Sequence, residues 1–180
     1  MLHAIKTIKQ QYKDIHPTYR IVGGPAVESD IAFQRKLQEL IGELGVQDKV
    51  ELPGPAPYSE IEKHHQWCNI AVNMTVKHSL DTTLLEAMAC GKPVVTTNEI
   101  FGKILSSYNE MMLCAQNNSD EMAQKIAALA RLDDAKLQKI SHDMREIIVK
   151  DHSLDRLIDR LVESFSTLKD DWYNERFFKD

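Results

Sequence analysis

One glutamate stands out because it interrupts an otherwise apolar helical segment. Residues 84–90 read Leu-Leu-Glu-Ala-Met-Ala-Cys, so Glu86 carries the only charge among them. A carboxylate is rarely buried without a partner, since removing the charge from water is costly. Glu86 is therefore expected to face solvent, a cation or a ligand with hydroxyl groups. A carboxylate can accept two hydrogen bonds from the vicinal diol of a ribose, and a surface or lysine-paired glutamate is the alternative.

The residues just before this helix favour a turn that could hold an anion. Ser79, Asp81, Thr82 and Thr83 are all of types preferred at the start of a helix. Where a helix follows a strand, its first backbone N–H groups can bind phosphate. His78 precedes this turn, and a loop histidine is otherwise an ordinary surface or hydrogen-bonded residue.

Other patterns of catalysis and metal binding are absent from the sequence. There is no HExxH, no GxxxxGK[ST] and no Ser-His-Asp order, and Gly23-Gly24-Pro25 does not match GxGxxG. His64-His65 lack a third ligand at a suitable spacing, so no metal site is predicted. An odd number of cysteines without CxxC spacing predicts neither disulfides nor zinc binding. We expect buried free thiols at Cys68, Cys90 and Cys114.

The composition is that of an ordinary globular domain. The chain has 180 residues, 43% hydrophobic and 27% charged, with a net charge of −5. This charge argues against nucleic-acid binding, which usually requires a basic surface. The apolar runs are too short for a membrane span or a signal peptide, so a cytoplasmic location is expected.

Helical and strand patterns alternate along the first two thirds of the chain. The expected helices are 2–14, 33–44, 59–67 and 84–90, and the expected strands are 19–22, 50–52, 69–74, 93–97 and a last one at 111–115. Short apolar strands separated by helices indicate a doubly wound parallel sheet covered on both faces. Such a sheet binds ligands beyond the carboxyl ends of its strands. Loops 23–25, 53–57, 73–81 and 97–102 are therefore expected to share one rim.

Helical patterns alone follow residue 116. Helices are predicted at about 119–131, 133–149 and 153–169. The last of them carries an apolar stripe, which we interpret as core packing rather than a partner site. The stripe consists of Leu154, Leu157, Ile158, Leu161, Phe165 and Leu168. The tail, 170–180, is expected to dock elsewhere or to fray.

Residues 84–95, Leu-Leu-Glu-Ala-Met-Ala-Cys-Gly-Lys-Pro-Val-Val, resemble the hallmark of glycosyltransferase family 4, the group 1 transferases with a GT-B fold. In that family a glutamate, seven residues and a second glutamate precede Ala-Met-Ala-x-Gly-x-Pro-Val. Segments 19–25, 45–54 and 68–72 resemble the family's second, third and fourth strand regions in the same order. The resemblance covers roughly residues 1–165.

The resemblance implies one half of a GT-B enzyme, whose two Rossmann-like domains hold acceptor and donor on either side of a cleft. Residues 1–118 would be the Rossmann-like domain that binds the nucleotide sugar, without its first strand. Residues 119–169 would be helices packed on it, and 170–180 a tail. Because the first strand normally lies between the second and fourth, we expect one of three outcomes. The sheet is split or widened between 19–22 and 69–74, another segment completes it, or the chain is part of an enzyme of roughly twice its length.

The resemblance also assigns donor-binding residues. Glu86 would bind the ribose hydroxyls, and the turn 79–83 would offer N–H groups to the diphosphate and sugar. Gly54 and Pro55 would lie near the base, and Gly24 would lie on the same rim. The full set is Glu86, His78, Ser79, Leu80, Asp81, Thr82, Thr83, Gly24, Gly54 and Pro55. No catalytic residue is assigned with certainty. No metal or other cofactor is implied besides the nucleoside diphosphate sugar, which is a substrate, because GT-B enzymes neutralise the diphosphate with helix ends and basic side chains.

Three departures from the family pattern bear on activity. His78 stands where the first glutamate is expected, and Ser79-Leu80-Asp81 replaces the frequent Gly-Phe-Gly. In the family a strand and a basic loop, with an arginine and a lysine for the phosphates, come before the helix that corresponds to 2–14, and this sequence starts in that helix. The resemblance makes a retaining transferase the first hypothesis, whereas His78 and the missing basic loop favour a domain without catalysis. A degenerate binding domain and another GT-B enzyme, such as a sugar-nucleotide epimerase, are the alternatives. The expected partners are a nucleotide sugar, an N-terminal acceptor domain and, through the longer enzyme, a peripheral membrane contact.

Overall fold

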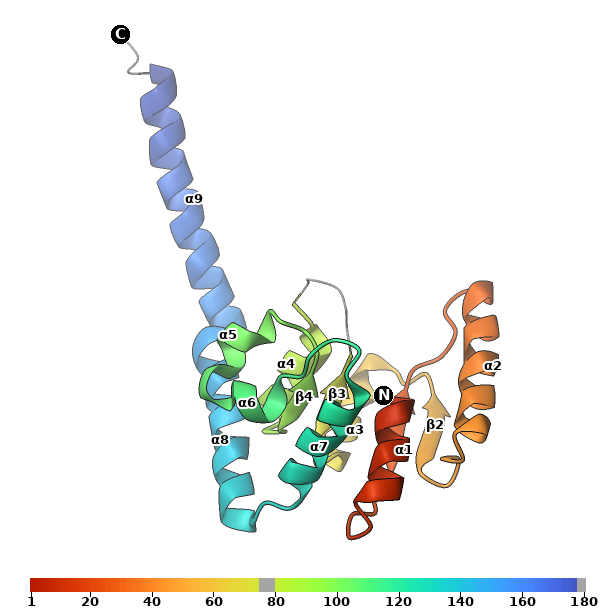
Figure 1. The fold of residues 1–180 in the computed structure, drawn as a ribbon. Coiled ribbons are helices and arrows are strands. Elements are labelled where there is room, and N and C mark those ends of the chain that lie inside the picture. The colour runs from red at the N-terminus through yellow and green to blue at the C-terminus, as the bar shows by residue number, and fades with distance from the viewer. Residues whose placement is uncertain (75–79, 178–180) are drawn as a thin grey trace.

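The structure, a computed structural model, describes residues 1–74 and 80–177, with side chains up to residue 166 (Figure 1). The elements in chain order are α1 Leu2–Gln11, β1 Tyr19–Val22, α2 Glu28–Glu43, β2 Val50–Gly54, α3 Tyr58–Trp67, β3 Ala71–Asn73, α4 Thr82–Ala89, β4 Val94–Thr96, α5 Phe101–Leu105, the 3-10 turn η1 Ser106–Tyr108, α6 Asn109–Met112, α7 Ser119–Ala130, α8 Asp134–Asp151 and α9 Leu154–Phe177. Within these described ranges, no helix has the length and apolarity needed to cross a membrane.

The strands form two separate parallel pairs. β1 lies beside β2, with Tyr19 opposite Val50, and β3 lies beside β4, with Ala71 opposite Val94. Among the described residues no ladder joins one pair to the other. The prediction of a sheet split between 19–22 and 69–74 is therefore confirmed, and so is the α/β class with short parallel strands.

The larger hydrophobic core surrounds β3 and β4. β4 is buried along its whole length, as expected for a parallel strand covered on both faces. α4 turns Leu84, Ala87 and Met88 into this core, which is one helical face because the residues are three and four positions apart. Helices α5 to α8 supply most of the remaining buried residues. This core fixes the position of α4 and of everything that α4 carries.

A smaller core lies between β1, β2, α1 and α2. It has four buried members, Leu2, Ile5, Ile41 and Val46. α1 belongs to both cores, since Ile5 lies in the smaller one and Ile8 in the larger one. α1 also packs alongside α7, as Figure 1 shows. α1 is therefore the main packed link between the two halves.

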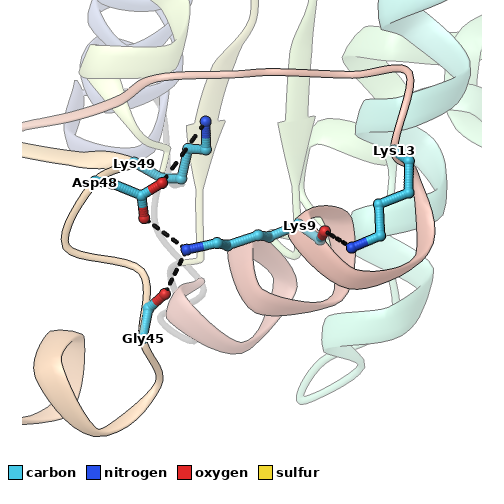
Figure 2. A network of polar contacts seen from close by, with 5 residues as sticks. All are labelled: Lys9, Lys13, Gly45, Asp48 and Lys49. Carbon is cyan, nitrogen blue, oxygen red and sulfur yellow. Dashed lines mark hydrogen bonds and ion pairs between the residues drawn. The ribbon is translucent and has the colours of Figure 1, made fainter.

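A polar network holds α1 to the loop that precedes β2 (Figure 2). Lys9 Nζ donates to the carbonyl oxygen of Gly45 at 2.7 Å and lies 2.6 Å from Asp48 Oδ1. Gly45 follows α2 with a φ of +65°, a conformation that favours glycine. Lys13 Nζ donates to the Lys9 carbonyl at 2.9 Å, and Lys49 Nζ lies 3.9 Å from Asp48 Oδ2. The network joins α1 to the smaller half from the side opposite the carboxyl ends of β1 and β2.

The predicted strand at 111–115 is wrong. Residues 109–112 form α6, and Leu113 then makes a single parallel bridge to Thr96. The Asn109 side chain donates to the Gly102 carbonyl at 2.7 Å, and Leu113 N donates to the Asn109 carbonyl at 2.9 Å. A short apolar run suits a buried helical turn as well as a strand, so periodicity could not separate the two.

The expectation that α9 packs into the core is also wrong. Leu154 is 69% exposed and Phe165 is 67% exposed, with the apolar residues between them exposed as well. Figure 1 shows α9 projecting away from the other elements. The helix also runs on to Phe177, through part of the segment expected to be a tail. The apolar spacing correctly indicated an amphipathic helix but carried no information about what covers it.

Candidate functional site

The loops after β1 and β2 lie against each other. Gly23 N donates to the Gly54 carbonyl at 3.0 Å, and Gly54 has a φ of +87°. A Cβ atom on Gly24 would lie 2.9 Å from Pro55 Cδ, so the close approach requires glycine. The structure thus brings together Gly54 and Pro55, which the family resemblance expected near a nucleotide base, and Gly24, which it expected on the same rim.

The carboxyl end of β3 is tied to the start of α4. Asn73 Nδ2 donates to Asp81 Oδ2 at 2.5 Å, and Asp81 Oδ1 accepts from Thr83 N at 3.0 Å. Asp81 is therefore the N-cap of α4, as its residue type suggested. Thr97 N, after β4, donates to the Asn73 carbonyl at 3.3 Å. The loops after β1 and β2 are thus joined to each other, and the residues that follow β3 and β4 are joined to each other.

The turn itself is described in part. His78 and Ser79 lie outside the described residues. Leu80 is exposed, as are Thr82 and Thr83 at the first positions of α4. The Asp81 carboxylate adds a negative charge to the positive end of the helix dipole, which opposes binding of an anion at the same place.

Glu86 lies just off the buried face of α4. Its side chain is 35% exposed, and its Oε2 atom lies 3.5 Å from Nε2 of His65. The carboxylate is thus open to solvent on one side and faces an imidazole on the other. The side chain beside the carboxylate is a histidine and not the lysine that one of the two alternative interpretations expected. The role of Glu86 toward a ribose stays a prediction.

His65 is the residue that sequence reasoning missed. It lies on α3 and is 8% exposed, and its Nε2 atom makes no hydrogen bond within the part of the chain that the structure describes. The 3.5 Å contact with Glu86 therefore has the separation of an ion pair without the geometry of a hydrogen bond. Ile61, four positions earlier and on the same helical face, could have indicated that His65 points inward.

α3 also connects the two halves of the molecule. At its end, the Arg20 guanidinium of β1 lies 3.7 Å from the centre of the Trp67 ring. Lys92, which follows α4, donates to the Gln66 carbonyl at 2.9 Å. The helix thus reaches β1 on one side and the α4 region on the other, and it begins three residues after Pro55.

The remaining reactive groups do not form a second centre. No three His, Cys, Asp or Glu side chains of residues 1–74 and 80–166 are grouped so that they could hold a metal ion. Cys114 is buried, which raises its thiol pKa to about 11, and burial also raises the pKa values of the partly exposed Cys68 and Cys90. Such thiols are weak nucleophiles at neutral pH. The expectation of free thiols holds, with full burial only at Cys114.

Parallel strands, covering helices and loops paired at the carboxyl ends of the strands define a Rossmann-like α/β domain. Residues 1–131 match the family model described as "Glycosyl transferases group 1". The chain belongs to the group 1 glycosyltransferase family.

Relatives and solved structures agree with this assignment. The putative colanic acid biosynthesis glycosyltransferase WcaL of Escherichia coli K12 is 26% identical over 164 residues, which cover 82% of this chain and 38% of that protein. Anabaena Alr3699/HepE in complex with UDP has a TM-score of 0.78 at 20% identity, over 92% of this chain and 44% of that one. The C-terminal domain of the group 1 protein LpcC of Francisella tularensis has a TM-score of 0.69 at 22% identity, over 85% and 77%.

The share of each protein that aligns with this chain indicates which domain of a group 1 transferase the chain corresponds to. The chain spans about two fifths of the length of WcaL, and it matches most of an isolated C-terminal domain. The expected C-terminal domain of a GT-B group 1 transferase is thereby confirmed.

Proposed function

We propose that this chain is the donor-binding domain of a retaining GT-B glycosyltransferase. It would bind a nucleoside diphosphate sugar, from which the complete enzyme transfers the sugar to an acceptor without a metal ion. The observation that carries the proposal is Glu86, a partly exposed carboxylate on the helix that begins at the carboxyl end of β3. Support comes from the family and from the UDP held by Anabaena HepE.

Each part of the rim would contact a different part of the donor. Glu86 would accept hydrogen bonds from the ribose hydroxyls, Gly54 and Pro55 would border the base, and Gly24 would lie on the same rim. The turn 79–83 would supply backbone N–H groups to the diphosphate. Acceptor groups and the basic residues that pair with the phosphates would come from outside these 180 residues.

A second candidate function is a binding domain without catalysis. The Asp81 carboxylate accepts from Thr83 N, so it takes up one of the N–H groups that a diphosphate would use and adds a repelling charge. His78 in place of the family's first glutamate favours the same alternative. This candidate predicts weak nucleotide binding or none.

Isothermal titration with UDP, GDP and ADP, and with their sugars, separates the two candidates. We expect one nucleotide to bind and Glu86→Ala to weaken it by about 10- to 100-fold, the effect of losing hydrogen bonds to a charged group. Glu39→Ala, which removes an exposed glutamate of α2, is the matched control and should leave binding unchanged. If no nucleotide binds, the second candidate is favoured.

A further inference from the structure

We infer that His65 is a positioning residue that holds the Glu86 carboxylate toward the ribose, an inference that rests on the proposed function. The two side chains come from different helices, α3 and α4, and His65 Nε2 lies 3.5 Å from Glu86 Oε2. The histidine is buried whereas the glutamate is partly exposed, so the imidazole lies on the protein side of the carboxylate.

The burial of His65 indicates that this contact matters. Nearly all buried polar side-chain atoms in proteins have a hydrogen-bond partner, and each exception needs an explanation. Nε2 of His65 is one of four such exceptions among the described residues, and Glu86 is the acceptor that its ion-pair contact identifies. A small rotation of the glutamate would turn the contact into a hydrogen bond, with the N–H of His65 donating to Oε2.

Such a bond would help ribose binding by ordering the carboxylate. A glutamate on a helix surface loses considerable rotamer freedom when it must adopt one conformation for a ligand. A donor on Oε2 would fix that conformation in advance and leave Oε1, together with remaining lone pairs, for the diol. Pre-ordering of this kind raises affinity without adding a contact to the ligand.

The other charged groups near the pair already have partners. Lys92 donates to the Gln66 carbonyl at 2.9 Å, and Arg145 of α8 donates to the Ala89 carbonyl at 2.5 Å. His65 is therefore the group placed to orient Glu86, and it does so from the helix that follows the loop containing Pro55.

A double-mutant cycle on the whole 180-residue chain tests the inference. The probe is whichever of UDP, GDP and ADP binds most tightly, together with its 2′,3′-dideoxy form. His65→Phe should weaken binding by about 3- to 10-fold, the range of one net hydrogen bond. His65→Gln, whose amide can donate from nearly the same place as Nε2, should restore affinity. Neither substitution should change the affinity in a Glu86→Ala background or for the dideoxy nucleotide.

Two controls separate a positioning role from a structural one. His64→Phe changes the adjacent, partly buried histidine and should not affect affinity if the protein stays folded. Nitrogen-15 shifts of the His65 ring should show the proton on Nε2 in the unliganded chain and a changed tautomer balance in Glu86→Ala.

The outcomes distinguish this inference from the proposed function. If a nucleotide binds with equal affinity to the parent chain and to His65→Phe, the inference fails while the proposed function stands. If His65→Phe is as harmful for the dideoxy nucleotide, the role of His65 is structural and the inference fails as well. If none of the three nucleotides binds, the proposed function is wrong, and the role inferred for His65, which depends on it, is wrong as well.

Discussion

The two strand pairs of this domain differ sharply in how well they are covered. β4 is wholly buried, and its half is enclosed by helices α4 to α8. In the other half β1 and β2 are only partly buried, and the sixteen-residue α2 buries Ile41 alone. Phe33 of α2 is 69% exposed, although it lies in the stretch whose apolar pattern predicted the helix. The two parallel strand pairs are therefore covered to different extents: a large core surrounds β3 and β4, and a small core covers β1 and β2.

Because of this difference, one part of the candidate site lies on a well-packed half of the domain and the other part on a poorly packed half. Asp81 and Glu86 belong to the well-covered half, whereas Gly24, Gly54 and Pro55 belong to the poorly covered one. Local opening is expected where few apolar contacts are buried. The loops proposed for the base should therefore be the more mobile part of the site, with α1 and α3 limiting their movement.

Two isoleucines on α1 test this division with the largest expected effect. Ile8→Ala removes a fully buried side chain from the larger core and should lower the free energy of unfolding by about 2–5 kcal/mol. Ile5→Ala removes the same groups from the smaller core, which should open before the whole domain unfolds. We expect a smaller change in the urea midpoint and faster hydrogen exchange confined to 19–22 and 50–54. Equal midpoints and uniformly faster exchange in both variants would show one cooperative unit.

Replacing two glycines in the smaller half should change the stability by the next largest amount, and in opposite directions. Gly24→Ala would place Cβ 2.9 Å from Pro55 Cδ, so it should destabilise by about 1–3 kcal/mol through overpacking. Gly42→Ala lies within α2 with nothing within 4 Å of the new atom, and should stabilise by about 0.5–1 kcal/mol. Thermal unfolding of both variants measures the contrast. A neutral Gly24→Ala would mean that the two loops separate easily.

The sequence indicated the elements well because local patterns determine them. The strand predicted at 19–22 is β1 residue for residue, and the sheet is split between 19–22 and 69–74 as expected. Helix ends were less accurate, since the helix expected to reach residue 14 ends at Gln11. Capping of α4 by Asp81 was also readable, because it depends on a side chain and the backbone two residues later.

Features that depend on contacts between distant segments could not be predicted from local sequence patterns. The exposure of the α9 stripe depends on which surface lies opposite it, and spacing within one helix does not contain that information. The His65–Glu86 contact joins two helices that are neighbours only in the folded chain. The donor roles of Glu86 and of the turn 79–83 came from family resemblance, and they stay predictions until binding is measured.

Two exposed ion pairs, one at each half, provide the smallest test. Arg131, at the end of α7, holds Asp14 through two hydrogen bonds of 2.7 and 2.8 Å, whereas Lys9 links α1 to Asp48 at 2.6 Å (Figure 2). The hydrogen bond from Arg131 lowers the carboxyl pKa of Asp14 from 3.8 to about 2. The hydrogen bond from Lys9 also lowers the pKa of Asp48.

Both pairs should lose their contribution in acid, because a depressed pKa in the folded state means that the unfolded state binds protons more readily. For Asp14 the contribution is complete above about pH 4 and disappears as the pH falls toward 2. Asp14→Asn should therefore flatten the fall in melting temperature over that range, and 1 M salt should reduce the difference from the parent chain. Asp48→Asn should flatten the fall less, and its effect on hydrogen exchange should be confined to 19–22 and 50–54. An acid dependence unchanged in both variants would show that neither pair contributes to stability.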